Sequence, residues 1–213
     1  RALEYYRRAL AIYGRAGNKS GMALVLGNIG VVYVEQNDYQ KALEYHQRAL
    51  TVDEQLGNAE GVARHLGNIA LVHIELSEYP RALQELQRTL TINERCGNTR
   101  SMAINLHNIG NVYDQMHDFP KALEYFEKAL SFNERAGRKG HIAANLTSIG
   151  GIHYDLADFP KALEFHQKAL IIYEQLGDEN GMATSFSNIG IAYQALADFP
   201  RAFEYAQRSL AIN

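Results

Sequence analysis

The sequence of 213 residues contains one cysteine, four prolines and no tryptophan. A single cysteine, Cys96, excludes an intrachain disulfide and a multi-cysteine zinc site. No apolar run approaches the roughly 20 residues that a membrane-spanning helix needs, and no signal peptide is visible. We therefore expect no membrane partner and a reducing, cytoplasmic location.

An excess of charge of one sign is also missing. The formal net charge is −3, from 21 basic and 24 acidic residues, so no basic surface indicates nucleic-acid binding. The sequence contains no H-E-x-x-H, G-x-x-x-x-G-K-[ST] or G-x-S-x-G motif and no Rossmann glycine set. We expect a protein that is not an enzyme and that has no cofactor, no metal site and no nucleic-acid partner.

What the sequence does contain is a repeat with a period of 40 residues and no insertion or deletion. The segment LGNIGVVYVEQNDYQKAL at residues 26–43 returns as LGNIALVHIELSEYPRAL, LHNIGNVYDQMHDFPKAL, LTSIGGIHYDLADFPKAL and FSNIGIAYQALADFPRAF. A fixed period of this size is the signature of a stacked-repeat architecture. Glycine recurs in one register, at Gly17, Gly57, Gly97, Gly137 and Gly177.

Each period is predicted to form two helices, A and B. Gly57 and Asn58 have the chemistry of a helix end followed by the N-cap of a helix A, which is then expected at about 59–76. A turn at 77–79 leads to Pro80 in the first turn of helix B, which continues to about Cys96. Cys96 falls in a register of alanines and leucines, so we expect it to be a small buried side chain. The chain is predicted to be a single array over 1–213, with a lone B helix at 1–16 and repeats at about 17–56, 57–96, 97–136, 137–176 and 177–213.

One face of helix A is apolar. At about 100° per residue, Leu26, Ile29, Gly30 and Tyr33 cluster on the face that is expected to pack on helix B. A small residue recurs in the register of Gly30, and we expect the missing side chain to let two helix backbones come close. The period and the repeated helix ends predict an all-α fold: a right-handed superhelical solenoid of stacked antiparallel helix pairs.

The pattern L-x-x-I-G-x-x-Y, followed by Ala42 and by Ala49 and Leu50, resembles the tetratricopeptide repeat, whose usual form has 34 residues. The resemblance covers essentially the whole chain. Leucine or phenylalanine stands where tryptophan is typical, the late proline is absent, and six residues extend each repeat. The long form is similar to repeats in kinesin light chains, in Pins-type adaptors, and in the sensory regions of bacterial cyclases and histidine kinases.

A second face of helix A lies about 150° from the apolar stripe and carries Asn28. Asparagine recurs in this register, which only Ser148 interrupts, and apolar and charged residues share the same face. In tetratricopeptide folds the A helices line the concave groove, so the resemblance implies that this face binds a ligand. The predicted peptide-binding residues are Asn28, Asn68, Asn108, Asn188, Arg64, Val31, Leu71, Asn111, Glu35 and Glu75.

An asparagine amide offers a donor and an acceptor, so it can pair with one peptide group of an extended chain. Neighbouring A helices should lie on the order of 10 Å apart, and an extended peptide advances roughly 3.3 Å per residue. An asparagine ladder would then hold about every third peptide unit, as related long-repeat adaptors are thought to do. The alternative is that these amides bond to the adjacent repeat.

The charges on this face limit the ligand. Tetratricopeptide co-chaperones that grip a C-terminal carboxylate place basic residues in the groove, but here the position before each ladder residue holds no basic Lys or Arg. Arg64 is the one basic residue in the predicted site, against Glu35 and Glu75. A ligand with apolar side chains and a basic residue fits better. The residues that stand one position before the asparagine register are Gly27, Gly67, His107, Thr147 and Ser187.

The histidines are not arranged for catalysis. Four of them take ring positions of the repeat and are expected to be part-buried ring substitutions: His46, His73, His153 and His166. Two others, His65 and His107, are expected to reach the groove, where contact with a partner is favoured over metal ligation.

The predicted function is a protein–protein interaction scaffold that binds an extended peptide. Two other interpretations remain: the sensory or regulatory arm of a larger signalling enzyme, such as a cyclase or histidine kinase, and a self-associating structural spacer. The helix at 1–16 lacks an A partner, and the last helix, at 200–213 with Phe203, Leu210 and Ile212, lacks a following repeat. Solenoids normally need polar capping repeats, so we expect a longer native chain or end-to-end association.

Overall fold

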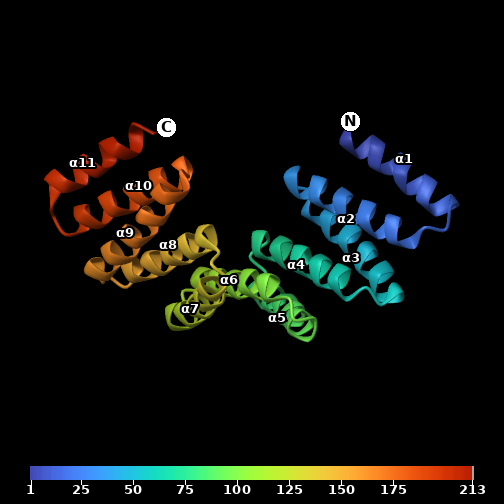
Figure 1. Ribbon diagram of the computed structural model, residues 1–213. Helices are drawn as coiled ribbons and strands as arrows, with labels where there is room; N and C mark the ends of the chain where they lie inside the picture. Colours follow the sequence, from blue (N-terminus) through green and yellow to red (C-terminus); the bar gives the residue numbers. More distant parts are fainter. Residues whose placement is uncertain (213) are drawn as a thin grey trace. The chain divides into compact units, whose positions relative to one another are not determined.

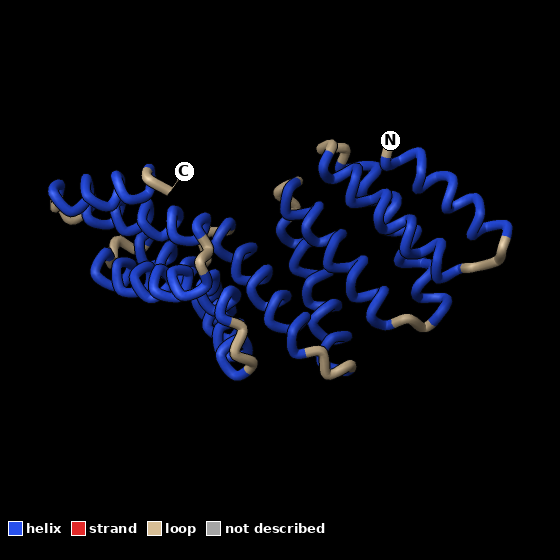
Figure 2. The backbone as a smooth tube through the Cα atoms, turned by 45° about the horizontal axis from the view of Figure 1, so that its top comes forward, coloured by secondary structure: helices blue, strands red, loops and turns tan. Residues whose placement is uncertain are grey.

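The computed structural model describes residues 1–212, and within that range every regular element is an α-helix (Figures 1 and 2). The predicted all-α fold is confirmed. The helices are α1 (Ala2–Arg15), α2 (Lys19–Glu35), α3 (Tyr39–Leu56), α4 (Ala59–Glu75), α5 (Tyr79–Arg95), α6 (Thr99–Gln115), α7 (Phe119–Arg135), α8 (Lys139–Asp155), α9 (Phe159–Leu176), α10 (Glu179–Ala195) and α11 (Phe199–Leu210).

The helices form two compact units, Arg1–Asn105 and Leu106–Asn213, whose boundary falls inside α6. In the first unit each helix from α1 to α5 packs against the next one along the chain. In the second unit the same holds from α7 to α11, and Figure 1 shows α10 running beside α11. The stacked antiparallel helix pairs are therefore as predicted. The single array over 1–213 and its repeat boundaries stay predictions. The helix predicted at 200–213 ends at Leu210, and residue 213 lies outside the described range.

The turn before each helix A has the predicted chemistry. Gly57 lies in the left-handed region at φ +66°, where glycine has no Cβ to clash. Its N–H bonds back to Glu54, and the Asn58 side chain accepts from the Gly61 N–H, which caps α4. The residue in the register of Asn58 before α8 is Arg138, and its side chain makes no cap to that helix.

The turn before each helix B contains a feature that was not predicted. One residue in each of these turns has a positive φ although none is glycine: Asn37, Ser77, His117, Ala157 and Ala197. The next residue is acidic and in most repeats caps helix B, as Asp38 does by accepting from the Lys41 N–H at 3.2 Å. The cap explains how the turn is held even where an alanine takes the left-handed conformation.

The apolar stripe of helix A is buried as predicted, but the role of its glycines needs correction. A Cβ at Gly110 would lie 2.6 Å from Cε1 of Phe126, and one at Gly30 would lie 2.7 Å from Nε2 of His46. These glycines thus make room for a ring of helix B. Only Gly190, whose partner helix carries Ala206, has backbone atoms as its nearest neighbours.

Cys96 is exposed, so the expectation that it is buried was wrong. It is the C-cap residue of α5, and its N–H bonds to the Ile92 carbonyl. The same register is exposed in the other repeats, for example at Leu56 and Leu176. A register shared with alanines and leucines therefore did not indicate burial here.

Candidate functional site

The predicted binding face in the first unit is a strip over α2 and α4, which contact each other. Two aliphatic side chains are exposed on it, Val31 at 42% and Leu71 at 45% of their surface, and Leu24 is exposed beside them. Val31 and Leu71 each follow two buried residues of the same helix, and the helix period turns them outward. The strip therefore offers apolar surface to solvent or to a partner.

Asn28 and Asn68 lie half-buried between these aliphatic residues on the strip. No hydrogen bond joins either amide to another of the described residues, and neither amide has an atom that is both fully buried and unpaired. The side chains therefore keep their donors and acceptors for solvent or a ligand. The alternative, in which these amides bond to the adjacent repeat, has no hydrogen bond in its favour at these two positions.

Three charged residues complete the strip in the first unit. Glu35 and Glu75 are exposed at the last residues of α2 and α4. Arg64 is exposed too, and its Nη2 lies 3.8 Å from Oδ2 of Asp53, which neutralises part of its charge. The strip is therefore more acidic than its formal charges suggest.

The remaining predicted residues belong to the second unit and are not gathered in one place. Asn108 and Asn111 are half-buried on α6, and Asn188 is half-buried on α10. The intervening helix, α8, carries Ser148 in the asparagine register. Asn188 lines a depression of about 180 Å³ between α8 and α10, together with Gly151, Tyr154, Asp155, His166 and Ile191.

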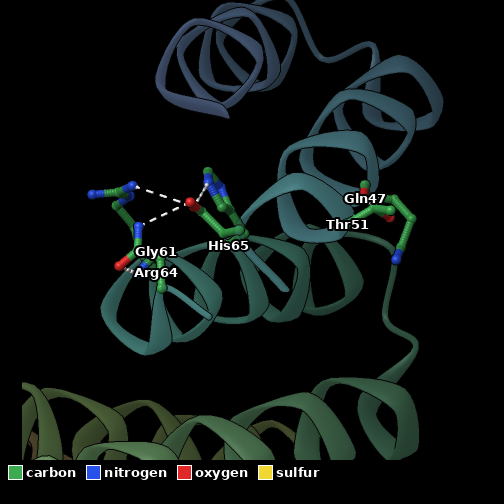
Figure 3. A network of polar contacts seen from close by, with 7 residues as sticks. Gln47, Thr51, Gly61, Arg64 and His65 are labelled. Atoms are coloured by element: carbon green, nitrogen blue, oxygen red, sulfur yellow. Dashed lines mark hydrogen bonds and ion pairs between the residues drawn. The ribbon is translucent and has the colours of Figure 1, made fainter. Parts of the chain in front are cut away.

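A buried polar cluster between α3 and α4 was not anticipated from the sequence. The Asp53 carboxylate is 1% exposed, accepts from the Asn58 amide at 2.8 Å, and lies 3.1 Å from Nε2 of His65. Figure 3 labels Gly61, Arg64 and His65 on α4, and its dashed lines mark the contacts of Arg64 and His65 with this carboxylate. Gly61 leaves the space that the carboxylate fills, because a Cβ there would overlap Asp53.

The expectation that His65 reaches the binding face was wrong. His65 is 1% exposed, and its ring lies 6.1 Å from that of His46, which is itself fully buried. Burial, and secondly the charge of His65, lowers the pKa of His46 to about 4. Burial also lowers the pKa of His65, with Arg64 acting in the same direction and Asp53 against it.

His107 also turns inward, contrary to expectation. Its ring lies 5.2 Å from that of Phe126, and burial lowers its pKa. Two asparagines, Asn105 on α6 and Asn145 on α8, are also buried, and they donate at 3.1 Å to the helix-B carbonyls of Leu86 and Phe126, respectively. The alternative role considered for the ladder asparagines thus belongs to these two residues. Their signal in the sequence was a polar residue in the register of buried Val25.

The described residues contain no group of three or more His, Cys, Asp or Glu side chains placed to hold a metal ion. The Asp53–His65 pair resembles an acid–base pair, but a reactant could reach it only if α3 and α4 separated. Across residues 1–212, none of the helices combines the length and apolar character needed to cross a bilayer.

Comparison with known proteins supports the repeat assignment. The family model described as "Tetratricopeptide repeat" matches residues 1–55, 61–135 and 141–213. No curated protein matches the sequence.

Among solved structures, the chain is similar to BtubC (BKLC) from P. vanneervenii, at 19% identity and a TM-score of 0.88, covering 100% of this chain and 89% of that one. It is similar to the putative kinesin light chain repeats of Podosopora anserina, at 16% identity and a TM-score of 0.75, covering 91% and 95%. A Rap protein complexed with Competence and Sporulation Factor has 17% identity and a TM-score of 0.73, covering 91% of this chain and 54% of that one.

Proposed function

Because the chain belongs to the tetratricopeptide repeat family, whose repeats are typical of protein–protein interaction scaffolds, we propose that it binds an extended segment of a protein partner along the exposed face of its A helices. The observation that carries the proposal is the strip over α2 and α4. It combines exposed aliphatic side chains with two asparagine amides that make no hydrogen bond to other described residues.

The aliphatic and amide groups would have different roles. Val31 and Leu71 would contact apolar side chains of the segment, which takes apolar area on both partners out of water. Asn28 and Asn68 would pair with its peptide groups, whatever the sequence. Binding through main-chain groups with selected side chains in shallow pockets is a recurring mode of peptide recognition.

The charges would select among segments. Glu35 and Glu75 stand at the C-terminal ends of their helices, where the helix dipole also favours a cation. A segment with a lysine or arginine near this edge would be preferred over an acidic one. Arg64 is partly neutralised by Asp53, and an acidic residue of the segment would be accepted only where it lies next to Arg64.

The experiment begins with a display library of random peptides selected on the full chain, followed by synthesis of one enriched peptide. Its Kd is then measured by fluorescence anisotropy on the parent chain and on two matched variants. Leu71→Glu places a charge on the strip, and we expect the affinity to fall at least about tenfold. Ile171→Glu changes an aliphatic residue on α9 that is at least as exposed as Leu71, and it should leave the affinity unchanged. Equal affinities for the parent and both variants would refute the proposed site.

A further inference from the structure

Four of the five A–B helix pairs share a stack of two rings, one from each helix. The ring in the register of Tyr33 on helix A lies nearly parallel to a ring in the register of Tyr45 on helix B. The centroid distances are 5.4 Å for Tyr33–Tyr45, 5.5 Å for Tyr113–Tyr125, 5.4 Å for His153–Phe165 and 5.6 Å for Tyr193–Tyr205.

Cations of helix B cover these stacks. Lys41 lies 5.3 Å from the centre of the Tyr33 ring, and Arg48 lies 5.0 Å from that of Tyr45. The arrangement recurs in the second unit, where Arg201 and Arg208 cover the two rings of the last pair. In four helix pairs, therefore, the space beside the helix-A ring holds a second planar group that stacks on it, with a positive charge next to the stack.

The pair α4–α5 departs from this arrangement. Its helix-A ring is His73, and its helix-B position holds Glu85 in place of a ring. The equivalent cations, Arg81 and Arg88, pair with carboxylates as their counterparts in the other repeats do, Arg88 with Oε2 of Glu85 at 3.0 Å and Arg81 with Glu78 at 2.9 Å. What differs is that Glu85 takes the place of the ring that the cation covers in the other pairs. Nδ1 of His73 lies 2.7 Å from the same Glu78 carboxylate, which fixes the orientation of the imidazole.

A pocket of about 490 Å³ lies where the missing ring would help to fill the space between α3, α4 and α5. Leu43 and Ile69 provide its apolar surface, His73 a planar face, and Glu44 and Glu85 carboxylates. No lysine or arginine lines it. All three helices belong to the first unit, so the pocket is defined within one compact body.

We propose that this pocket binds an arginine side chain of a protein partner. A guanidinium group is planar, so it can stack on the His73 ring as the rings of the other repeats do. It can bind a carboxylate through two parallel hydrogen bonds, and Oε1 of Glu85 accepts none from the described residues. The methylene stem of arginine would lie on Leu43 and Ile69. A lysine supplies the charge but has no planar group to stack.

The pocket does not depend on the proposed peptide-binding strip. On the helical wheel of α4, Ile69 and His73 lie about 150° from the face that carries Asn68 and Leu71. The chain would therefore contact partners on two faces, and variants in one need not affect the other.

The test uses the full chain and three small probes: the N-acetyl, N′-methylamide derivatives of arginine, lysine and norleucine. Backbone amide shifts in ¹H–¹⁵N spectra report binding at α3, α4 and α5. We expect saturable shifts there with the arginine probe, affinity at least about tenfold weaker with lysine, and no saturable shift with norleucine. Equal effects of all three probes, or none with arginine, would overturn the proposal.

Two variants locate the site. Glu85→Tyr installs the ring that Tyr45, Tyr125 and Tyr205 provide in other repeats, so the fold should be retained and the arginine shifts lost. Glu85→Gln keeps the size but removes the charge and should weaken binding about tenfold. Thermal melts verify folding of both variants. If Glu85→Tyr is folded and binds the arginine probe as the parent does, the pocket is not the site.

Discussion

Acid should destabilise this protein at a pH set by its buried histidines. Burial lowers the pKa of His46 and of His166 from 6.5 to about 4. The unfolded chain then binds more protons than the folded chain between these values, so the free energy of unfolding decreases as the pH falls from about 6.5 to about 4. Each histidine would account for about 3 kcal/mol across the whole range.

The repeats themselves supply a control that removes the titrating group without opening a cavity. His46 packs on Gly30, and the same two positions in the next repeat hold Leu86 and Ala70. The double variant Gly30→Ala, His46→Leu therefore copies a pair that the chain already packs. Urea unfolding at about pH 7 and about pH 4.5 should show that the parent loses about 2 kcal/mol more than the variant on acidification.

Capping carboxylates titrate in a separate, lower range. Hydrogen bonds from Lys41 and Lys121 lower the pKa of Asp38 and Asp118, so their contribution is present above the ordinary pKa of 3.8 and is lost below it. Parent and variant share these groups. If the double variant lost as much stability as the parent between about pH 7 and about pH 4.5, then His46 would not be neutral in the fold, and the account of its burial would fail.

Two further changes follow from the packing. Gly110→Leu should lower the free energy of unfolding by about 1–3 kcal/mol or more, because even its Cβ would overlap the buried Phe126 ring. The control Gly151→Ala has no atom within 4 Å of its Cβ and should melt no earlier than the parent. If Gly110→Leu melted at the same temperature as the parent, the packing role of Gly110 would be refuted. At α11, Phe203 is 65% exposed beside Phe199 and Leu210 around a depression of about 580 Å³. We expect copies to associate through this face at high concentration and Phe203→Glu to weaken the association, so a parent that sediments as a monomer under those conditions would contradict it.

The sequence was sufficient for the helices and their ends because the chemistry of those ends is local. Gly57 followed by Asn58 specifies a left-handed residue and a cap within a few residues of chain, and the pattern returns in each period. The positive φ at Ala157 and Ala197 could not be predicted in this way, since alanine does not favour it. There the surrounding turn and the aspartate cap decide the conformation.

Contacts between helices were harder to predict because they depend on how two helices are aligned. The pairing of Gly30 with the His46 ring requires the register of helix A against helix B, which the period does not give. The partnership of Asp53 with His65 needs the same information between successive repeats. Glu85 did leave a signal, because it alone among the helix-B residues of its register is not aromatic.

For the candidate strip, the sequence predicts which residues face outward but not how the buried residues beneath them are arranged. The helix period places Val31 and Leu71 on the outer face, and both are exposed. His65 stands in the register of the buried Val25, so its inward position had the same signal as that of Asn105. The period does not show that Arg64 would lie near a buried carboxylate. Such details alter the charge available to a ligand.

The most direct test is the double variant Asn28→Ala, Asn68→Ala, measured both for its melting temperature and for its Kd with peptides selected on the parent chain. Alanine is the better helix former, so the melting temperature should be unchanged or slightly higher. Each lost pairing should remove roughly 0.5–1.5 kcal/mol of binding, which together weakens affinity about 5- to 150-fold. The loss should be similar for peptides of different sequence, because the amides would contact the peptide backbone. A variant that melts early and still binds its peptides normally would show that the asparagines serve packing, and it would contradict the proposed function.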